Sequence, residues 1–272
     1  MGIFALVKQP VAVTVVLTSC NRFDLLDRTL SSFAATNDYP IARFILIEDS
    51  GLEAVTEVID RYPSLGIELI LNRPNLGQYA SIDRAYREVN TEFIFHSEDD
   101  WQFLRPRILA ESVALLEADP SIAVVWPRGD EGAPRWIKKT PRSKLAGVDI
   151  RPIDPRAHHR WGNFTFNPGL RRLSHYRMMP GGYATYGEGG TSIFLKRHGL
   201  RMVILAETGV AHIGGDGRST GAADALLKAD NPVSERGKMS KKISRAPTSL
   251  LSRLSHTLWR AKLFLRLLFG QR

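Results

Sequence analysis

The chain has 272 residues, 43% of them apolar and 24% charged, which is the composition of a globular protein with a sizeable buried core. Its net charge of +9 comes from one end: residues 236–272 hold ten Lys or Arg and no Asp or Glu, which leaves 27 basic and 28 acidic residues before them. This neutral body argues against a surface that binds nucleic acid, and the single cysteine, Cys20, excludes an intramolecular disulfide and a multi-cysteine zinc site.

Targeting signals and membrane spans are not recognisable in the sequence. The first residues lack a basic region followed by a long apolar stretch, so we expect no secretory signal. The sixth residue is Leu6 rather than Ser or Thr, which argues against myristoylation of Gly2. No apolar run of the about 18 residues that a spanning helix needs is free of charge. We therefore expect a cytoplasmic protein.

Four β-rich segments alternate with helical patterns over the first hundred residues. Residues 11–18 are a nearly unbroken β-branched run, typical of a parallel strand buried on both faces. A helical pattern follows, with one apolar face formed by Leu25, Leu26, Leu30 and Phe33. Further strands are predicted at 43–47, 67–71 and 93–95, and the helices between them at 54–61 and 78–89. This alternation predicts an α/β fold with a parallel sheet and right-handed crossovers.

The first predicted strand leads into the turn Ser19-Cys20-Asn21-Arg22. A dehydrogenase-type dinucleotide fold expects a glycine-rich turn at this position, and a P-loop protein expects its own glycine-rich motif. Because the turn contains no glycine, we exclude both. Polar residues at such strand-to-helix turns can still hold a phosphate, since helix N-termini and loop amides favour anions.

Three acidic residues, Glu98, Asp99 and Asp100, follow the fourth strand directly. In an open α/β sheet, ligands bind at the carboxyl edge of the strands. Carboxylates this close repel one another unless a proton or a cation neutralises them, and Mg²⁺ or Mn²⁺ would do so and bring a phosphate-bearing substrate. The alternative is a solvated acidic turn that caps the helix starting near Pro106.

Four segments carry a resemblance to a known family: VVLTSCNR, ILIEDSG, NRPNLGQ and FIFHSEDDW, in this order and spacing. Together they resemble the nucleotide-sugar half of family 2 glycosyltransferases with the GT-A fold, well over residues 11–125 and loosely beyond. The resemblance implies a GT-A-type, Rossmann-like, mostly parallel sheet flanked by helices, with residues 1–126 as the nucleotide-sugar-binding half. It also implies single displacement of a nucleotide-diphosphate sugar with inversion at the anomeric carbon.

The resemblance also implies donor-binding roles. The nucleoside pocket would be lined by Thr18, Ser19, Asn21 and Arg22. Asp49 would accept a hydrogen bond from the base, and the residues near the ribose or diphosphate would be Arg73, Asn75 and Gly77, with Asp99 also among the donor-binding residues. Judged from the residues alone, Asp49 could instead cap the next helix, and Arg22 could be an exposed surface side chain.

The acidic triplet would occupy the place of the family's Asp-x-Asp metal motif. The first Asp of the commonest form aligns with Ser97, so the cation would fall to Asp99 and Asp100. This Glu-Asp-Asp version is similar to that of some N-acetylglucosaminyltransferases, in which the final Asp binds the ion. The resemblance also implies that His212 can be a further metal ligand, although a lone histidine is otherwise more often structural. The predicted ligands of Mg²⁺ or Mn²⁺ are thus Glu98, Asp99, Asp100 and His212.

Residues 127–222 are predicted to form the acceptor-side half. Within it, residues 129–160 are expected to be a long basic loop or lid that attracts an acidic acceptor or simply faces solvent. Its basic residues are Arg135, Lys138, Lys139, Arg142 and Lys144. Family members often place a carboxylate where Glu188 stands, so Glu188 is the candidate general base, and Asp100 is the second candidate catalytic residue. The alternative for Glu188 is a helix-entry glutamate favoured by the helix dipole.

The end of the chain carries a separate signal. Residues 223–247 are polar and predict a linker, and residues 248–272 predict a basic amphipathic helix with one leucine-rich stripe. Such a helix is typical of one lying on an anionic membrane surface. The alternative is a helix docked on the body of the protein or on a second subunit.

These patterns together predict a metal-dependent glycosyltransferase, cytoplasmic and peripheral on the inner face of the membrane. It would move a sugar from a nucleotide-sugar to a glycan or lipid-linked acceptor. One alternative is a nucleotidyltransferase, which would be expected to carry a glycine-rich, arginine-containing loop after the first strand that this chain lacks. Another is a non-catalytic, membrane-bound glycan-binding module on a transferase fold, which Ser97 in place of the usual Asp leaves open.

Overall fold

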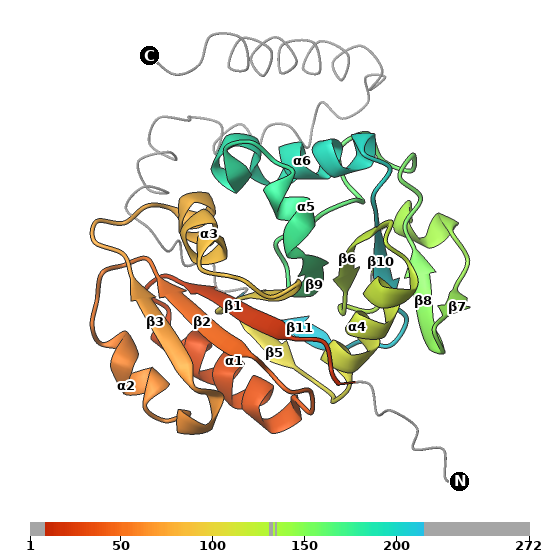
Figure 1. Cartoon of the computed structure of the whole chain (residues 1–272). Helices are drawn as coiled ribbons and strands as arrows, with labels where there is room; N and C mark the ends of the chain where they lie inside the picture. The colour runs from red at the N-terminus through yellow and green to blue at the C-terminus, as the bar shows by residue number, and fades with distance from the viewer. Residues whose placement is uncertain (1–8, 131–132, 134, 215–272) are drawn as a thin grey trace, which may run out of the picture. The chain divides into compact units, whose positions relative to one another are not determined.

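The computed structural model describes residues 9–130, 133 and 135–214 (Figure 1). The predicted linker at 223–247 and the predicted amphipathic helix at 248–272 lie outside these residues. Within the part of the chain that is described, none of the helices has the length and apolar character needed to cross a membrane.

A mixed sheet organises the described residues, and nine of their strands lie in it in the order β3-β2-β1-β4-β9-β6-β10-β8-β7. These strands are β1 (Val13–Ser19), β2 (Arg43–Glu48), β3 (Ile67–Leu71), β4 (Phe93–Glu98), β6 (Ile122–Trp126), β7 (Ser143–Leu145), β8 (Val148–Pro152), β9 (Gly169–Arg172) and β10 (Arg201–Leu205). The α-helices are α1 (Phe23–Thr36), α2 (Val55–Ile59), α3 (Gln78–Arg87), α4 (Ile108–Ala118), α5 (Leu173–Arg177) and α6 (Gly182–Arg197).

The first four strands of the sheet are parallel, as predicted. Strand β1 is buried along its whole length because β2 and β4 flank it and helices cover both of its faces. The register places Ser19 opposite Glu48 and Thr18 opposite Glu98, so the carboxyl ends of β1, β2 and β4 meet at one edge. The predicted α/β architecture with a mostly parallel sheet is confirmed.

Strand β9 joins the second half of the chain to the first. It lies antiparallel between β4 and β6, so the two predicted halves share one sheet. A Cβ atom on Gly169 would lie only 2.7 Å from the carbonyl oxygen of Val125, which is closer than Cβ atoms approach in real structures. The absence of a side chain at Gly169 is therefore what allows β9 to pack this closely beside β6.

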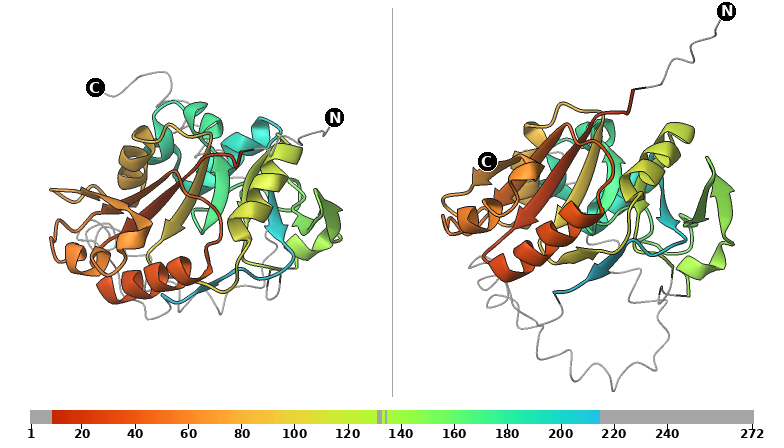
Figure 2. Two further views of the ribbon diagram at one scale, coloured as in Figure 1. Left: turned by 60° about the horizontal axis from the view of Figure 1, so that its bottom comes forward. Right: turned by 90° about the horizontal axis from the view of Figure 1, so that it is seen from below.

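Helices cover both faces of the sheet (Figures 1 and 2). On one face, α1 and α4 pack apolar side chains such as Leu26, Phe33 and Leu116 onto the strands. On the other face, α3 and α6 contribute Tyr86 and Tyr183, whose ring centroids lie 5.4 Å apart. The sheet is thus buried on both sides, as a mainly parallel sheet requires.

Residues 129–160, predicted as a long loop or lid, contain a β-hairpin of β7 and β8 that extends the sheet beyond β10. The segment is fixed partly by Asp130, which accepts hydrogen bonds from Arg142 (2.6 and 3.0 Å) and Arg151 (2.6 Å). These two guanidinium groups hold the pKa of the Asp130 carboxyl well below its usual range. Two of the basic side chains in this segment therefore serve its own structure.

A short ribbon that the sequence analysis did not predict lies beside the main sheet. Strand β5 (Trp101–Phe103) pairs antiparallel with β11 (Val210–His212), and the register sets His212 opposite Trp101. The backbone N–H of Ile213 also donates to the carbonyl oxygen of Asp100 (2.9 Å). The ribbon thus brings the end of the described chain to the acidic triplet.

Candidate active site

The backbone of the turn after β1 is hydrogen-bonded to the carboxyl end of β2. Asn21 has a φ of 56°, a left-handed conformation that asparagine tolerates better than most residues. Its backbone N–H donates to Glu48 Oε1 (3.0 Å), and the backbone N–H of Ser50 donates to the same oxygen (3.0 Å). Glu48 is fully buried, and the sequence analysis assigned it no role. Its position as the last residue of a buried strand was the signal that could have identified it.

Asp49 fixes the loop that precedes α3. Its Oδ1 accepts hydrogen bonds from Asn72 Nδ2 (2.7 Å) and from the backbone N–H of Leu76 (2.8 Å), and its Oδ2 accepts one from the backbone N–H of Gly77 (2.8 Å). Asn75 Nδ2 donates in turn to the backbone carbonyl of Asp49 (2.8 Å). Asp49, Asn75 and Gly77, which the resemblance places around the nucleotide, therefore form one connected wall.

The other predicted donor-binding residues lie at different depths. Thr18 and Ser19 are buried at the end of β1, and Ser19 Oγ has no hydrogen-bond partner within the described residues. Arg73 lies outside the cluster, on the rim, where it donates to the carbonyl oxygen of Gly51 (3.0 Å) and forms an ion pair with Glu53 (2.8 Å). Its guanidinium is therefore engaged away from the acidic triplet.

The guanidinium of Arg22 contacts two carboxylates of the acidic triplet, those of Asp99 and Asp100. Its Nη1 contacts Asp100 Oδ2 (2.7 Å), its Nε contacts Asp99 Oδ2 (3.3 Å), and its Nη2 forms an ion pair with Asp99 Oδ1. The backbone N–H of Cys20 also donates to Asp99 Oδ2 (3.3 Å). Arg22 is thus not an exposed surface residue: its side chain is 16% exposed and its guanidinium is paired with two carboxylates.

Burial makes two of the three carboxyl groups weaker acids than usual. It raises the pKa of Asp99 to about 6, although the positive charge of Arg22 counteracts this effect. Burial also raises the pKa of Glu98 to about 7, and the charges of Asp100 and Asp99 add to the increase. The raised pKa values mean that the ionised carboxylates are unfavourable in these buried surroundings. A nearby cation stabilises the ionised forms, so a bound cation is favourable here.

Glu98 faces a different direction from its two neighbours. Its Oε1 accepts a hydrogen bond from Gln78 Nε2 (2.7 Å), and its Oε2 accepts one from Trp101 Nε1 (3.4 Å). Gln78 is the first residue of α3, and the ring of the next residue, Tyr79, packs against that of Phe166, with centroids 5.3 Å apart and the planes tilted by 32°. Glu98 thus connects the carboxylate cluster to the start of α3, where the neighbouring Tyr79 contacts the acceptor-side half.

The donor pair best placed for a divalent cation is Asp100 and His212. Asp100 Oδ2 and His212 Nε2 lie 3.2 Å apart, close to the roughly 3 Å that separates neighbouring ligands of an octahedral ion with bonds of about 2.1 Å. A Cβ atom on Gly214 would lie 2.3 Å from Asp100 Oδ2, so that glycine leaves room for the approach. Among the described residues, no three metal-ligating side chains converge on one point. The pair therefore fits a cation that completes its coordination with substrate oxygens and water.

Glu188 lies on the acceptor side, at a break in α6. Gly187 has the non-helical angles φ 59° and ψ −178°, and a Cβ atom there would lie 3.3 Å from the ring of Tyr79. Glu188 Oε1 accepts hydrogen bonds from Thr165 Oγ1 (2.8 Å) and the backbone N–H of Phe166 (3.1 Å). The charge of Glu188 is also among the causes that raise the pKa of Glu98, after burial and the charges of Asp100 and Asp99.

Asp83 fixes the start of α6 and hence the segment that carries Glu188. Its two carboxylate oxygens accept hydrogen bonds from the backbone N–H groups of Tyr183 and Ala184, both at 2.8 Å. A Cβ atom on Gly182 would lie 2.5 Å from Asp83 Oδ1, so the contact needs a glycine there. The sequence analysis did not identify this helix-capping carboxylate, because it lies a hundred residues before its partners.

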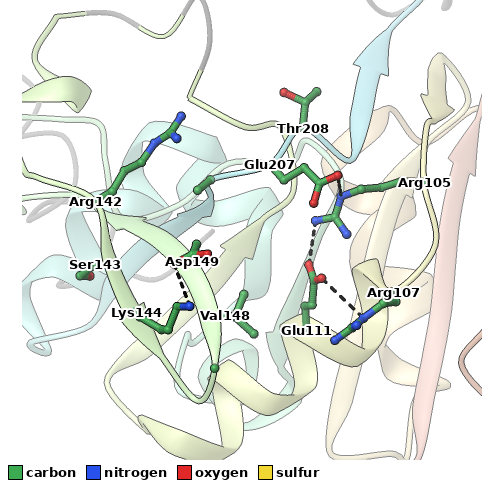
Figure 3. Close-up of a pocket in the computed structure, with 12 residues that line it drawn as sticks. Arg105, Arg107, Glu111, Arg142, Ser143, Lys144, Val148, Asp149, Glu207 and Thr208 are labelled. Atoms are coloured by element: carbon green, nitrogen blue, oxygen red, sulfur yellow. Dashed lines mark hydrogen bonds and ion pairs between the residues drawn. The ribbon is translucent and has the colours of Figure 1, made fainter.

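A cavity of about 1000 Å³ lies elsewhere, between the N-terminus of α4, the β7–β8 hairpin and the chain that follows β10 (Figure 3). Its charged walls are paired: Arg105 with Glu111 (2.7 Å), and Lys144 with Asp149 (3.6 Å). None of the predicted site residues lines it. Because these charges compensate each other, the cavity offers little free positive charge to an acidic acceptor.

Comparison with known proteins decides the family. The sequence profile of glycosyl transferase family 2 matches residues 14–186, more than half of the chain. The chain belongs to glycosyl transferase family 2. The sequence-based resemblance is therefore confirmed, and so is the predicted enzyme class at the level of the family. No curated protein matched the chain in a sequence search.

Three solved structures illustrate the fold of this family 2 member. The mannosyltransferase PcManGT from Pyrobaculum calidifontis, in complex with GDP-Man and Mn²⁺, is 17% identical with a TM-score of 0.58, over 86% of this chain and 65% of its own. S. aureus TarS 1–349 with UDP-GlcNAc is 13% identical with a TM-score of 0.55, over 76% and 62%. GalNAc-T7 with UDP, GalNAc and Mn²⁺ is 15% identical with a TM-score of 0.59, over 82% and 48%.

These likenesses confirm the predicted GT-A-type fold. The chain spans less than two thirds of the length of each of these three structures.

Proposed function

We propose that this chain transfers a sugar from a nucleoside-diphosphate sugar to a hydroxyl group of a glycan or lipid-linked acceptor, with inversion at the anomeric carbon. The observation that supports this most is the convergence of Arg22, Asp100 and His212 at the carboxyl ends of β1 and β4. Family membership and the nucleotide-sugars held by PcManGT and TarS point to the same donor class.

Asp100 and His212 would hold a Mg²⁺ or Mn²⁺ ion. When bound, the ion would neutralise the negative charge that develops on the departing nucleoside diphosphate. The predicted ligands Glu98 and Asp99 are engaged with Gln78, Trp101 and Arg22, so we narrow the proposed ligand set to Asp100 and His212. PcManGT and GalNAc-T7 were both solved with Mn²⁺, which is in keeping with this proposal.

The wall formed by Asp49, Asn75 and Gly77 would position the nucleotide, together with Thr18, Ser19 and Asn21 at the end of β1. Asp49 would contact the base only after giving up one of the hydrogen bonds that its buried carboxylate accepts from Asn72, Leu76 and Gly77. Arg73, on the rim, would approach the ribose or diphosphate only after leaving Glu53. This arrangement would place the sugar between the acidic triplet and Glu188.

Glu188 would act as the general base. Its carboxylate would take the proton of the acceptor hydroxyl as the hydroxyl oxygen forms a bond to the anomeric carbon, while the bond from that carbon to the phosphate oxygen breaks. The bonding electrons leave with the nucleoside diphosphate. Thr165 and the backbone of Phe166 hold Glu188 Oε1, which leaves the second carboxylate oxygen to face the acceptor.

A screen of nucleotide-sugars for thermal stabilisation tests the proposed function. Ligands that bind the native state stabilise it, so one class of donor should raise the unfolding temperature in the presence of Mn²⁺. With EDTA in place of Mn²⁺, the same donor should raise the unfolding temperature less, or not at all. Hydrolysis or transfer with that donor would then establish catalysis. Glycan binding that is indifferent to chelators, with no effect of any nucleotide-sugar, would favour a non-catalytic module instead.

We further propose that residues 248–272 attach the protein to an anionic membrane surface, on the inner face. Each Lys or Arg near such a surface contributes on the order of 1 kcal/mol to binding. Deleting residues 248–272 should therefore abolish co-sedimentation with vesicles that contain anionic lipid. Vesicles of neutral lipid serve as the control for charge-dependent binding. Unchanged co-sedimentation of the truncated protein would contradict the proposal.

A further inference from the structure

Arg22 is held in place by its backbone as well as by its side chain. Its carbonyl oxygen accepts hydrogen bonds from the backbone N–H groups of Leu25 (3.0 Å) and Leu26 (2.9 Å), so the residue begins α1. The preceding residue, Asn21, is fixed to Glu48 on the neighbouring strand. The guanidinium therefore reaches the carboxylates from a backbone fixed on both sides.

The two carboxylates that Arg22 contacts differ in access. The side chain of Asp99 is only 1% exposed, and both of its oxygens are occupied by Arg22, with Cys20 adding a backbone N–H. The side chain of Asp100 is 9% exposed and shares only one oxygen, Oδ2, between Arg22 Nη1 (2.7 Å) and His212 Nε2 (3.2 Å). Asp99 thus anchors the arginine, and Asp100 is the carboxylate that an entering ion can reach.

A divalent cation bound to Asp100 Oδ2 would lie within a few ångströms of the Arg22 guanidinium. Two positive charges at that distance, in a partly buried site, repel each other strongly. The Arg22 Nη1 contact and the cation also compete for the same oxygen atom. Arg22 therefore already balances one of the two negative charges of this carboxylate pair whenever no metal ion is bound.

We propose that Arg22 is the resident counter-ion of this carboxylate pair and sets its affinity for divalent cations. The contacts of Arg22 with Asp99 persist, whereas its contact with Asp100 is the one that a cation replaces. This inference rests on the proposed function in one respect, namely that Asp100 is the cation ligand. It assigns to Arg22 and Asp99 a role different from nucleoside contact and metal ligation.

Coupling between the cation and the nucleotide follows from this arrangement. A cation that arrives alone displaces the Arg22 guanidinium from Asp100 and brings no anion that the guanidinium could face in exchange, so it binds weakly. A cation that arrives with a nucleoside diphosphate brings negative charge that can face both the ion and the guanidinium. The two ligands should therefore bind cooperatively, and by linkage each raises the affinity for the other by the same factor.

Manganese titration of the full chain, followed by the electron paramagnetic resonance signal of free Mn²⁺, tests the proposal without any activity assay. Without nucleotide, Arg22→Gln should bind Mn²⁺ about tenfold more tightly than wild type, because a nearby positive charge is gone. Arg22→Lys should fall between the two, because an ammonium group cannot contact both carboxylates in the fork geometry of a guanidinium. Arg28→Gln, an exposed position on α1, controls for net charge and should match wild type.

Repeating the titrations with UDP and GDP measures the coupling. Either nucleotide should raise the affinity of the wild type for Mn²⁺. The same nucleotide should raise the Mn²⁺ affinity of Arg22→Gln by a smaller factor. Equal or weaker Mn²⁺ binding by Arg22→Gln and Arg22→Lys, with binding by wild type intact, would overturn the role of Arg22 while leaving the proposed function in place. A complete lack of Mn²⁺ binding by every variant, even with nucleotide, would overturn the cation site itself and the inference with it.

Discussion

Replacing Asp100 by alanine is expected to lower the rate of sugar transfer by about a hundredfold to a thousandfold, the range seen when one group that stabilises transition-state charge is removed. Asp100 Oδ2 is the atom that the guanidinium of Arg22 and the imidazole of His212 both approach. Without it, the proposed cation site keeps only one ligand. The measurement is the initial rate of nucleoside diphosphate release at saturating donor and acceptor.

The same substitution should leave the fold intact. The charge of Asp100 is one of the causes that raise the pKa values of Glu98 and Asp99, so its removal relieves repulsion within the cluster. The unfolding temperature of Asp100→Ala should therefore remain close to that of wild type. Asp60→Ala, at an exposed position after α2, is the matched control. Turnover like that of wild type in Asp100→Ala would refute the assignment of Asp100.

Replacing Glu188 by glutamine is expected to lower the transfer rate by about a hundredfold to ten-thousandfold, the usual contribution of a general base. The amide oxygen of glutamine can still accept the hydrogen bonds from Thr165 and Phe166, so the local structure should persist. Because the substitution removes only the group that takes the proton, kcat should fall while the KM for the donor changes little. Steady-state kinetics with varied donor concentration separates the two effects.

Glu57→Gln, at an exposed position on α2, provides the control for this carboxylate-to-amide change. It should behave as wild type in every kinetic parameter. A Glu188→Gln variant that transfers sugar at the wild-type rate would leave the helix-entry role as the sole function of this residue. If the KM for the donor instead rises by the factor by which the transfer rate falls, Glu188 contacts the donor rather than the acceptor.

The parallel half of the sheet was predictable because its strands carry a strong local pattern. The run from Val13 to Ser19 is buried on both faces, and such strands read as continuous apolar or β-branched segments. The helices between them show apolar stripes at helical spacing. Since parallel strands end at one edge, the position of the acidic triplet beside the turn after β1 followed from the same reasoning.

The elements that the sequence analysis missed are short or lie at the sheet margin. Strands β5 and β11 have three residues each, too few to show an alternating pattern. Among the eight residues of strands β7 and β8, only Ile150 is buried, and several others are charged, so the composition of the hairpin is that of a loop. Strand β9 was not missed, since a strand was expected within residues 163–172, but its place between β4 and β6 could not be predicted because both partners precede it by dozens of residues.

The contacts of Arg22 could not be predicted for a related reason. Asp99 lies 77 residues further along the chain, and no local pattern connects the two side chains. The sequence indicated a cluster of carboxylates in need of a positive charge, but it could not show that part of that charge is supplied internally. Only the folded structure, which sets the first turn of α1 beside the carboxyl end of β4, decides this.

The central claim is that the carboxylate edge of this sheet binds a nucleotide-sugar through a divalent cation. Calorimetric titration of the donor selected by the thermal screen, with Mn²⁺ and with EDTA, into wild type and Asp100→Ala tests it most directly. Saturable binding that needs both Mn²⁺ and Asp100 is the predicted result. Equal donor affinity in all four titrations would contradict the claim, because the donor would then bind without a cation at this edge.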